Sequence, residues 1–381
     1  MLYTPRLVNG RPVALTWPMT FYRRFNIICW PLEDNAVWWT HIFTTVIYMV
    51  SFLIFVMHND AEVRYLRVNF HNLDDMLTGI PTYFVLIEIH IRAFTSAFEK
   101  KSFKWMLRKF YAEIFIEESL RPDIHAGNLR SYYPVLAFSI LYLCALLSYI
   151  VFTIYGLAVG EKPLPYKMIP PFDYNSWYIY TPLVLSSLWV GFIVASTIVG
   201  ESYALTMFVH NLDGRYQMMG ERLNMGVENI LKFSSNDSEA IEKFHRILIA
   251  TLKENIRLNK FAQEIQREFS FRIFIIFSFL AATLCVLVFK VYTSPVNSIP
   301  YVFWTIGKVQ ETIAFGQIGT TIISRTDALS SMYYESKWEA VIQHSSNAKA
   351  NVSFFVLCRY FKVLAHILHF SYRYVEDDSM D

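Results

Sequence analysis

The sequence predicts an all-α membrane protein with seven transmembrane helices, and three observations support that fold class. Hydrophobic residues make up 54% of the 381 residues and charged residues only 17%, whereas a soluble chain carries roughly a quarter charged residues. Seven apolar stretches reach about the 20 residues that a helix needs to cross a bilayer. Lysine and arginine also concentrate in alternate connecting segments, as they do in chains that cross a membrane repeatedly.

The predicted spans are distributed along the whole chain. They cover approximately residues 36–57, 76–98, 133–155, 177–199, 270–292, 299–323 and 352–371. The second contains Gly79 and Pro81, and we expect the proline to kink the helix and open a gap beside it. The sixth carries Lys308 and Glu311 and the seventh carries Arg359, so neither should face lipid all round.

Charged residues within the second and sixth spans are candidates for polar contacts inside the membrane. Glu88, His90 and Arg92 occupy alternate positions late in span two, so we expect that they do not share one helix face. We expect Arg92 to extend along its helix toward the membrane surface. Lys308 and Glu311 are three residues apart and can pair on one face, as a structural pair or in the wall of a polar cavity.

The distribution of basic residues also predicts the orientation of the chain. Lysine and arginine are frequent in residues 1–35, 99–132, 211–269 and 324–351 and rare in the other connections, which places the frequent set in the cytoplasm. The N-terminus is then intracellular and, after seven spans, the C-terminus extracellular. Receptors that couple to G proteins have the opposite orientation. The chain also lacks an Asp-Arg-Tyr after span three and an Asn-Pro-x-x-Tyr in span seven, which disfavours that class.

These assignments divide the chain into three regions. Residues 1–35 form a cytoplasmic N-terminal segment. Residues 36–323 hold transmembrane helices one to six, with helical cytoplasmic loops at 99–132 and 211–269. Residues 324–381 hold a cytoplasmic anchor and the last helix.

Two cytoplasmic segments have the apolar spacing of amphipathic helices. Residues 206–226 continue the pattern of span four beyond the membrane. Residues 240–269 place one apolar stripe among charged faces, formed by Ile241, Phe244, Leu248, Leu252, Ile256 and Phe269. The two helices can bury their stripes against each other within one subunit, or subunits can meet there.

The external connection between spans three and four has a different character. Its sequence is EKPLPYKMIPPFDYNS, residues 161–176, and four prolines hold it extended and stiff. We expect it to form a lid over the outer end of the helices.

No catalytic motif is present in the sequence. We find no Gly-rich phosphate loop, no His-Glu-x-x-His and no Gly-x-Ser-x-Gly, so the protein is not predicted to be an enzyme or to need a cofactor. The four cysteines, Cys29, Cys144, Cys285 and Cys358, lack metal-ligand spacing. A net charge of +2 gives no electrostatic support for nucleic-acid binding.

Aromatic and small polar residues in the outer halves of spans two, three, four and six predict a ligand pocket. An apolar pocket with a few hydroxyl groups suits a small, volatile-like or lipid-like molecule, although ordinary helix packing also uses such residues. The candidate ligand-binding residues are Met76, Ile80, Tyr83, Phe84, Ser148, Tyr149, Phe152, Tyr178, Ser186, Trp189, Tyr301 and Trp304.

Four stretches of this chain resemble the insect odorant receptor family. They are RFNIICWPLED before span one, PPFDYNSWYIY at the start of span four, HRILIATLKENIRLNKFAQEIQREFSFRIFIIF leading into span five, and FGQIGTTIISRTDALSSMYYESKW after span six. In the family, span six ends in a glycine, a serine-rich turn and Tyr-x-x-x-Trp. Gly319, Thr326, Tyr334 and Trp338 hold these places here, with threonine in place of the usual serine.

The resemblance implies an odorant-specific subunit of a ligand-gated, non-selective cation channel. Such a subunit assembles with a co-receptor, as a tetramer, in the plasma membrane of an olfactory neuron dendrite and requires no G protein. Small hydrophobic odorants would bind in the outer pocket, and Tyr334 and Trp338 would form part of the anchor between subunits.

Two alignments with the family remain open for the C-terminal segment. In one, residues 352–371 form the pore helix, the acidic tail lies at the outer mouth and favours cations, and the pore is lined by Leu364, Ile367, Leu368 and Ser371. In the other, FFVLCRYFK aligns with the cytoplasmic helix that precedes the pore helix in the family, and VEDDSMD stands where most of the pore helix would be.

Two other function classes are weighed against the odorant receptor. A gustatory-type receptor channel of the same superfamily usually carries Thr-Tyr-hydrophobic-Gln-Phe in span seven, which we do not find here. A secondary transporter would show internal repeats and matching broken helices, and the sequence shows no repeat.

The predicted orientation has a direct chemical test at two glycosylation sequons, Asn236 and Asn351. The first is placed in the cytoplasm and the second at the inner membrane edge, where no sugar is added. Treatment with an endoglycosidase should therefore leave the electrophoretic mobility of the expressed protein unchanged. A glycan on Asn236, identified by mass spectrometry, would reverse the orientation.

Overall fold

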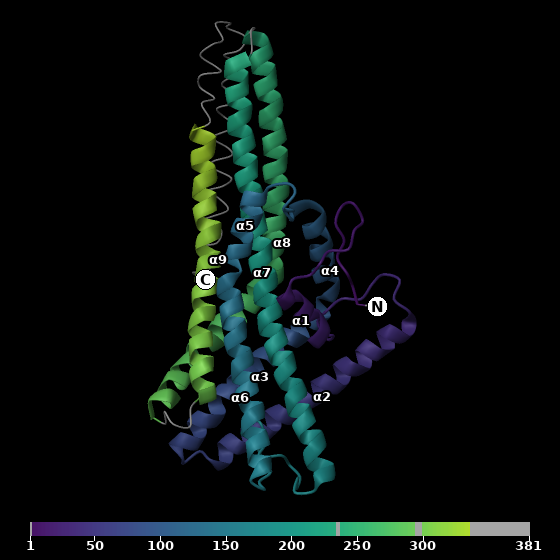
Figure 1. Ribbon diagram of the computed structural model, residues 1–381, viewed down its shortest axis with the longest axis vertical. Helices are drawn as coiled ribbons and strands as arrows, with labels where there is room; N and C mark the ends of the chain where they lie inside the picture. The colour runs from purple at the N-terminus through teal and green to yellow at the C-terminus, as the bar shows by residue number, and fades with distance from the viewer. Residues whose placement is uncertain (1, 234–236, 294–298, 336–381) are drawn as a thin grey trace, which may run out of the picture. The chain divides into compact units, whose positions relative to one another are not determined.

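The computed structural model describes residues 2–233, 237–293 and 299–335, and these residues are almost entirely helical (Figure 1). The elements are α1 (Trp17–Phe25), α2 (Trp38–Val68), α3 (Leu73–Phe98), α4 (Lys100–Lys109), the π-helical turn η1 (Phe110–Ile114), α5 (Pro122–Ser131), α6 (Tyr133–Ala158), α7 (Trp177–Phe233), α8 (Asp237–Thr293) and α9 (Ile299–Glu335). In the described ranges, extended pairing is limited to two isolated bridges near the N-terminus. The predicted all-α class is confirmed.

Six of the seven predicted spans coincide with helices, α2, α3, α6, α7, α8 and α9, and the seventh lies outside the described residues. Length and hydropathy alone would allow four described helical stretches to cross a membrane: Trp38–Val68, Pro122–Ala158, Trp177–Phe233 and Glu239–Thr293. The helices α3 and α9 are not in this set, and both carry buried charged residues. Their charges pair with each other and with charges on neighbouring helices, as described below.

The chain divides into two compact units, and α7, α8 and α9 each contribute to both. Unit 1 contains Met1–Phe208 and Glu264–Gln317, and unit 2 contains Val209–Gln263 and Ile318–Asp381. The predicted N-terminal segment, residues 1–35, thus belongs to the same unit as the helices that follow it.

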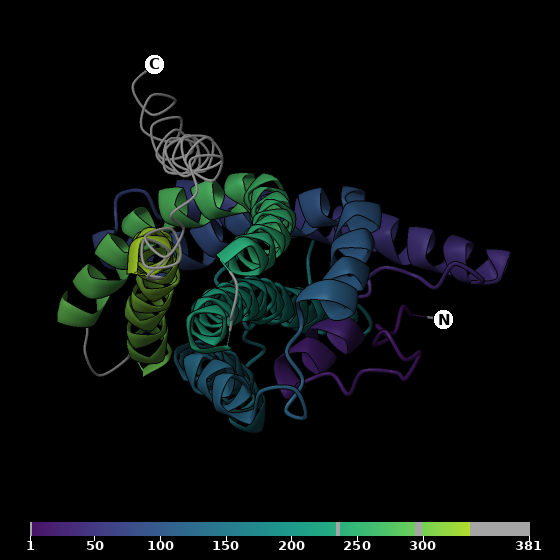
Figure 2. The same cartoon turned by 90° about the horizontal axis from the view of Figure 1, so that it is seen from above.

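The N-terminal segment is held in unit 1 by buried aromatic and polar contacts. The indole nitrogen of Trp30 donates to the carbonyl oxygen of Tyr3 at 2.9 Å, and the Trp30 ring packs edge-on against Tyr22. The side chain of Asn26 donates to the Thr197 hydroxyl at 2.7 Å, so α1 lies against α7 (Figures 1 and 2). These fully buried contacts make the segment part of the core of unit 1.

A glycine in α7 permits the close approach of α1. A Cβ atom at Gly200 would overlap the ring of Tyr22, which is buried and packed against Phe103 as well as Trp30. An aromatic ring held on several sides cannot move aside at low cost. Gly200 is therefore required by packing.

In unit 2, the continuations of α7 and α8 pack against each other, which is one of the two arrangements that the sequence leaves open. Arg222 Nη1 lies 2.8 Å from Glu254, and the Tyr216 hydroxyl donates to Asn259 at 2.5 Å. The predicted stripe needs one correction. Ile256 is 67% exposed, because the buried positions follow a spacing of three and four residues. The residues buried at that spacing are Phe244, Leu248, Thr251, Asn255, Leu258, Phe261 and Ile265.

The packing of Gly200 gives a stability prediction with a matched control. Gly200→Ala should lower the free energy of unfolding by roughly 1–3 kcal/mol, the usual effect of overpacking a core. Gly316→Ala, on α9, has no heavy atom within 4 Å of the new Cβ and should stabilise the helix by about 0.5–1 kcal/mol. Thermal unfolding in detergent measures both variants. Equal stability of the two would contradict the close α1–α7 contact.

Candidate ligand-binding site

A buried ion pair joins α3 to α7 at the centre of unit 1. Arg92 and Glu88 are both fully buried, and Arg92 Nη1 lies 2.6 Å from Glu88 Oε1. Arg92 Nη2 lies 3.0 Å from Glu201 Oε2 on α7. Two expectations were therefore wrong. Glu88 and Arg92 do share a helix face, because they are four residues apart, and Arg92 is paired with carboxylates inside the protein instead of reaching the membrane surface.

The ion pairs continue from α3 to α9 and α6. Lys308 Nζ lies 3.4 Å from Glu88 and 3.0 Å from Glu311, so the pair expected within span six is confirmed. The Tyr142 hydroxyl on α6 donates to Glu311 Oε2 at 2.6 Å. Because Lys308 and Glu311 are fully buried, each charge depends on these partners for stabilisation.

A third arm of the network reaches α8. Arg272 lies 2.8 Å from both Glu268 and Glu99, and 3.9 Å from Glu201. The Ser96 hydroxyl donates to Glu201 Oε1 at 2.5 Å. The buried ionic network formed by Glu88, Arg92, Glu201, Glu268, Arg272, Lys308 and Glu311 therefore fixes the positions of α3, α7, α8 and α9 in unit 1.

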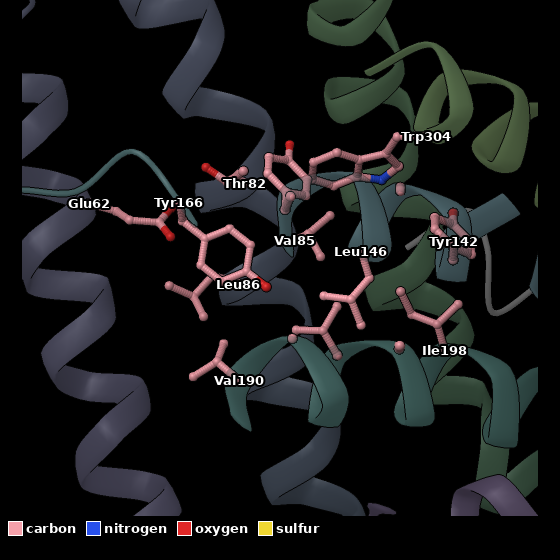
Figure 3. A pocket seen from close by; sticks show the side chains of 15 residues that line it. Glu62, Thr82, Val85, Leu86, Tyr142, Leu146, Tyr166, Val190, Ile198 and Trp304 are labelled. Carbon is pink, nitrogen blue, oxygen red and sulfur yellow. The ribbon is translucent and has the colours of Figure 1, made fainter. Parts of the chain in front are cut away.

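A cavity of about 70 Å³ lies in unit 1 (Figure 3). Its walls come from α2, α3, α6, α7, α9 and the proline-rich loop between α6 and α7. It is lined by Glu62, Thr82, Val85, Leu86, Tyr142, Ala145, Leu146, Tyr149, Tyr166, Val190, Gly191, Val194, Ala195, Ile198 and Trp304. Most of these side chains are apolar or aromatic, as is typical of small-molecule sites.

The proline-rich loop supplies one wall of the cavity through Tyr166. The ring of Tyr166 lies 5.5 Å from that of Tyr149, centroid to centroid. A Cβ atom at Gly191 would overlap the Tyr166 hydroxyl, so glycine provides the room for this ring. Burial raises the pKa of the Tyr166 hydroxyl, which keeps it protonated.

The same loop is fixed to two helices, as expected of a lid. Its Ile169 amide donates to the carbonyl of Ala61 on α2 at 2.9 Å, and the Tyr180 hydroxyl on α7 donates to the carbonyl of Pro163 at 2.7 Å. Met168 packs in an apolar cluster with Ala61 and Leu183. The loop therefore forms one wall of the cavity and is attached to both α2 and α7 within unit 1.

Three polar groups in the cavity wall have no hydrogen-bond partner among the described residues. Glu62 is 2% exposed, and its Oε2 atom is one of them. The others are the indole Nε1 of Trp304 and the hydroxyl of Tyr149. Figure 3 shows Glu62 beside Tyr166 at one end of the cavity and Trp304 toward the other end. The cavity thus presents three polar groups without partners in a lining that is mainly apolar and aromatic.

The structure brings two of the twelve predicted ligand-binding residues into this lining, Tyr149 and Trp304. Tyr301 contacts Tyr149, with a ring centroid distance of 6.4 Å, and its hydroxyl donates to the Thr78 carbonyl at 2.8 Å. The other nine do not line this cavity.

The nine remaining residues occupy several environments in unit 1. Tyr178 is 93% exposed, and Phe152 is also exposed. Trp189 donates to the Ser51 hydroxyl at 3.0 Å, which places it against α2. The other six are partly buried positions within the helices: Met76, Ile80, Tyr83, Phe84, Ser148 and Ser186.

Sequence reasoning missed Glu62, Tyr142 and Tyr166. Glu62 lies beyond the predicted end of span one at residue 57, although α2 continues to Val68. Glu62 follows the buried residues Phe55 and His58 at intervals of three and four, and this periodicity could have placed it on the inner face. Tyr166 lies in a loop that was interpreted only as a cover, so no ligand contact was predicted there.

The predicted pore residues Leu364, Ile367, Leu368 and Ser371, and the anchor residue Trp338, lie outside the described residues, as does the side chain of the anchor residue Tyr334.

Comparison with known proteins identifies the family. The family model for 7tm Odorant receptor matches residues 72–357, which is most of the chain. The chain belongs to the 7tm odorant receptor family. This family consists of receptors and not of enzymes. Odorant receptor 74a of Drosophila melanogaster is 35% identical over 350 residues, covering 92% of this chain and 86% of that protein. Odorant receptor 35a of the same species is 34% identical over 353 residues, with the same coverage of both chains.

The fold of this receptor also matches solved structures. The insect olfactory receptor OR5 from Machilis hrabei superposes with a TM-score of 0.66 at 10% sequence identity, covering 92% of this chain and 89% of that one. The same receptor in complex with eugenol superposes with a TM-score of 0.63 at 13% identity, covering 92% of this chain and 98% of that one. At these identities the superpositions establish a shared fold.

The buried ionic network predicts a large difference between two arginine substitutions. Arg92→Met leaves Glu88 and Glu201 without their shared cation, and should lower the free energy of unfolding by roughly 3–5 kcal/mol. Arg64→Met removes a pair with Asp60 in which both side chains are about half exposed, and should change it by at most about 1 kcal/mol. Thermal unfolding and folded yield in detergent distinguish the two. An Arg92→Met receptor as stable as Arg64→Met would contradict the network's structural role.

Proposed function

We propose that this receptor binds a small volatile molecule in the cavity of unit 1 and, with a co-receptor subunit, gates a non-selective cation channel. The observation that carries the proposal is the mainly apolar cavity with aromatic walls, formed by five helices and an ordered loop. Membership of the odorant receptor family supports the same conclusion. A solved receptor of the same fold, OR5 from Machilis hrabei, binds eugenol.

The size of the cavity restricts its ligands. An apolar protein cavity of about 150 Å³ accommodates benzene, whereas this cavity measures about 70 Å³. A ligand of more than a few heavy atoms therefore requires movement of lining side chains. Tyr149 and Trp304 are the large rings whose rotation would enlarge it.

Tyr142 provides a physical connection between the ligand and the rest of the channel. Its ring lines the cavity, and its hydroxyl binds Glu311 of α9. A ligand that repositions this ring changes the contact between α6 and α9. It shifts a closed-to-open equilibrium only to the extent that it binds the open state more tightly.

The assembly proposed for this receptor follows its family. The partner is a co-receptor, the complex is a tetramer in the plasma membrane of an olfactory neuron dendrite, and no G protein takes part. Residues Leu364, Ile367, Leu368 and Ser371 are proposed to line the pore, and Tyr334 and Trp338 to anchor the subunit interface.

A cavity-filling substitution tests the proposed binding site. Val190→Phe places a ring in the cavity and should raise the odorant concentration for half-maximal current at least about tenfold, because a ligand then lacks space. Leu185→Phe lies on the same helix but at an exposed position, and should leave that concentration unchanged. Currents are recorded from cells that express each receptor with the co-receptor, at matched surface levels.

The controls for this experiment are cells that express either subunit alone. Odorant-evoked current should require both subunits. Uptake of a solute without any current would contradict the proposed channel, and equal responses of the two phenylalanine variants would contradict the proposed site.

A further inference from the structure

We infer that the cavity selects small apolar molecules carrying a hydrogen-bond donor, a hydroxyl or an amine, which the carboxyl group of Glu62 receives. The inference rests on the proposed function, since it takes the cavity as the odorant site. It adds a directed polar contact at the end of the cavity where Glu62 lies beside Tyr166.

Glu62 differs from the other buried carboxylates of this chain. Five glutamates are buried among the described residues. Four of them, Glu88, Glu201, Glu268 and Glu311, lie within 3.0 Å of a lysine or arginine. Glu62 forms no ion pair within the part of the chain that the structure describes. Among the buried glutamates of the described residues, Glu62 at the cavity is thus the one without a cationic partner.

Among the described residues, one of the two carboxyl oxygens of Glu62 has no hydrogen-bond partner. The hydroxyl of Thr82 lies beside it, but this hydroxyl donates to the Gly79 carbonyl at 2.8 Å and has only one proton to give. The Oε2 atom of Glu62 is left without any partner. A buried polar atom without a hydrogen-bond partner is strongly disfavoured. A ligand that supplies a donor to it therefore gains more binding free energy than it would from a group that is already hydrogen-bonded.

The lining determines which molecules can supply that donor. Next to Glu62, the cavity is walled by the ring of Tyr166 and by apolar side chains such as Leu86 and Val190. A primary alkanol places its hydroxyl against Glu62 and its chain along these residues. A protonated alkylamine adds an ion pair, and the faces of nearby aromatic rings also favour a cation.

An ether of the same formula has no donor. It fills the same volume but offers no proton to the Glu62 Oε2 atom, and sites built to accept a hydrogen bond reject analogues that cannot donate one. The contrast between an alkanol and its isomeric methyl ether therefore isolates the role of Glu62 from that of size and apolar surface.

The test records currents from the receptor and its co-receptor with butan-1-ol, methyl propyl ether and butan-1-amine, and with longer members of the three series. In the wild type, the alkanol or the amine should reach half-maximal current at a concentration at least about tenfold below that of the isomeric ether, the value of one hydrogen bond to a buried partner. Glu62→Leu should remove this difference by weakening the donor ligands while the ether response persists.

A second variant distinguishes the two donor classes. Glu62→Gln retains a hydrogen-bonding oxygen but cannot become negatively charged, so it should preserve preference for the alkanol and weaken the response to the amine. Val190→Ala, an apolar change in the same wall, should alter alkanol and ether responses by similar factors.

Several results would overturn the inference. The first is that the wild-type receptor is as sensitive to the ether as to the alkanol and the amine. The second is that it responds to other odorants but to none of these donor ligands. The third is that Glu62→Leu leaves the selectivity unchanged. If Glu62→Leu gives no current with any odorant, the same test is made with Glu62→Met, and the wild-type difference between alkanol and ether still tests the inference. Failure of the proposed function has a separate signature, because the wild type would then give no current with any odorant.

Discussion

The pairing of Arg92 with Glu201 is the interaction on which the rest of unit 1 depends. It joins α3 to α7 across the core, and both side chains are buried. In such an environment each charge is stable only beside its partner, so the ion pairs fix which turns of the helices face each other. Arg272 adds α8 to this arrangement and Lys308 adds α9.

The network also positions the cavity. Thr82, Val85 and Leu86 line the cavity from the turns of α3 that precede Glu88, so the register that Glu88 and Arg92 impose on this helix also places them. Tyr142 belongs to both sites, with its ring in the cavity wall and its hydroxyl on Glu311. One side of the cavity is therefore held by ionic contacts, whereas Tyr166 approaches the other side from a loop.

Much of the fold could be predicted from the sequence because it depends on local patterns. Apolar length predicted helices at six spans, and the spacing of Lys308 and Glu311 predicted their contact. The continuation of α7 and α8 into paired helices of unit 2 followed from periodicity in the same way. The family was recognisable because its motifs are distributed along the chain in a fixed order.

The details of the site could not be predicted because they depend on distant partners. The partner of Arg92 could not be identified from the sequence because Glu201 is more than a hundred residues away. Without a partner in view, Arg92 was expected to reach the membrane surface. Aromatic content suggested a pocket but not which rings face it, and Tyr178 is exposed whereas Tyr149 lines the cavity. Glu62 was missed because α2 continues beyond the residues apolar enough to be identified as a span.

The most direct test of the central claim, that the cavity held in place by the buried ion pairs receives the odorant, is a structure of the receptor with its co-receptor and an odorant that evokes current. The account predicts density for the odorant in contact with Tyr149 and Trp304, and the Arg92–Glu201 pair intact. Odorant density elsewhere in the receptor, with this cavity filled by rearranged side chains, would contradict it.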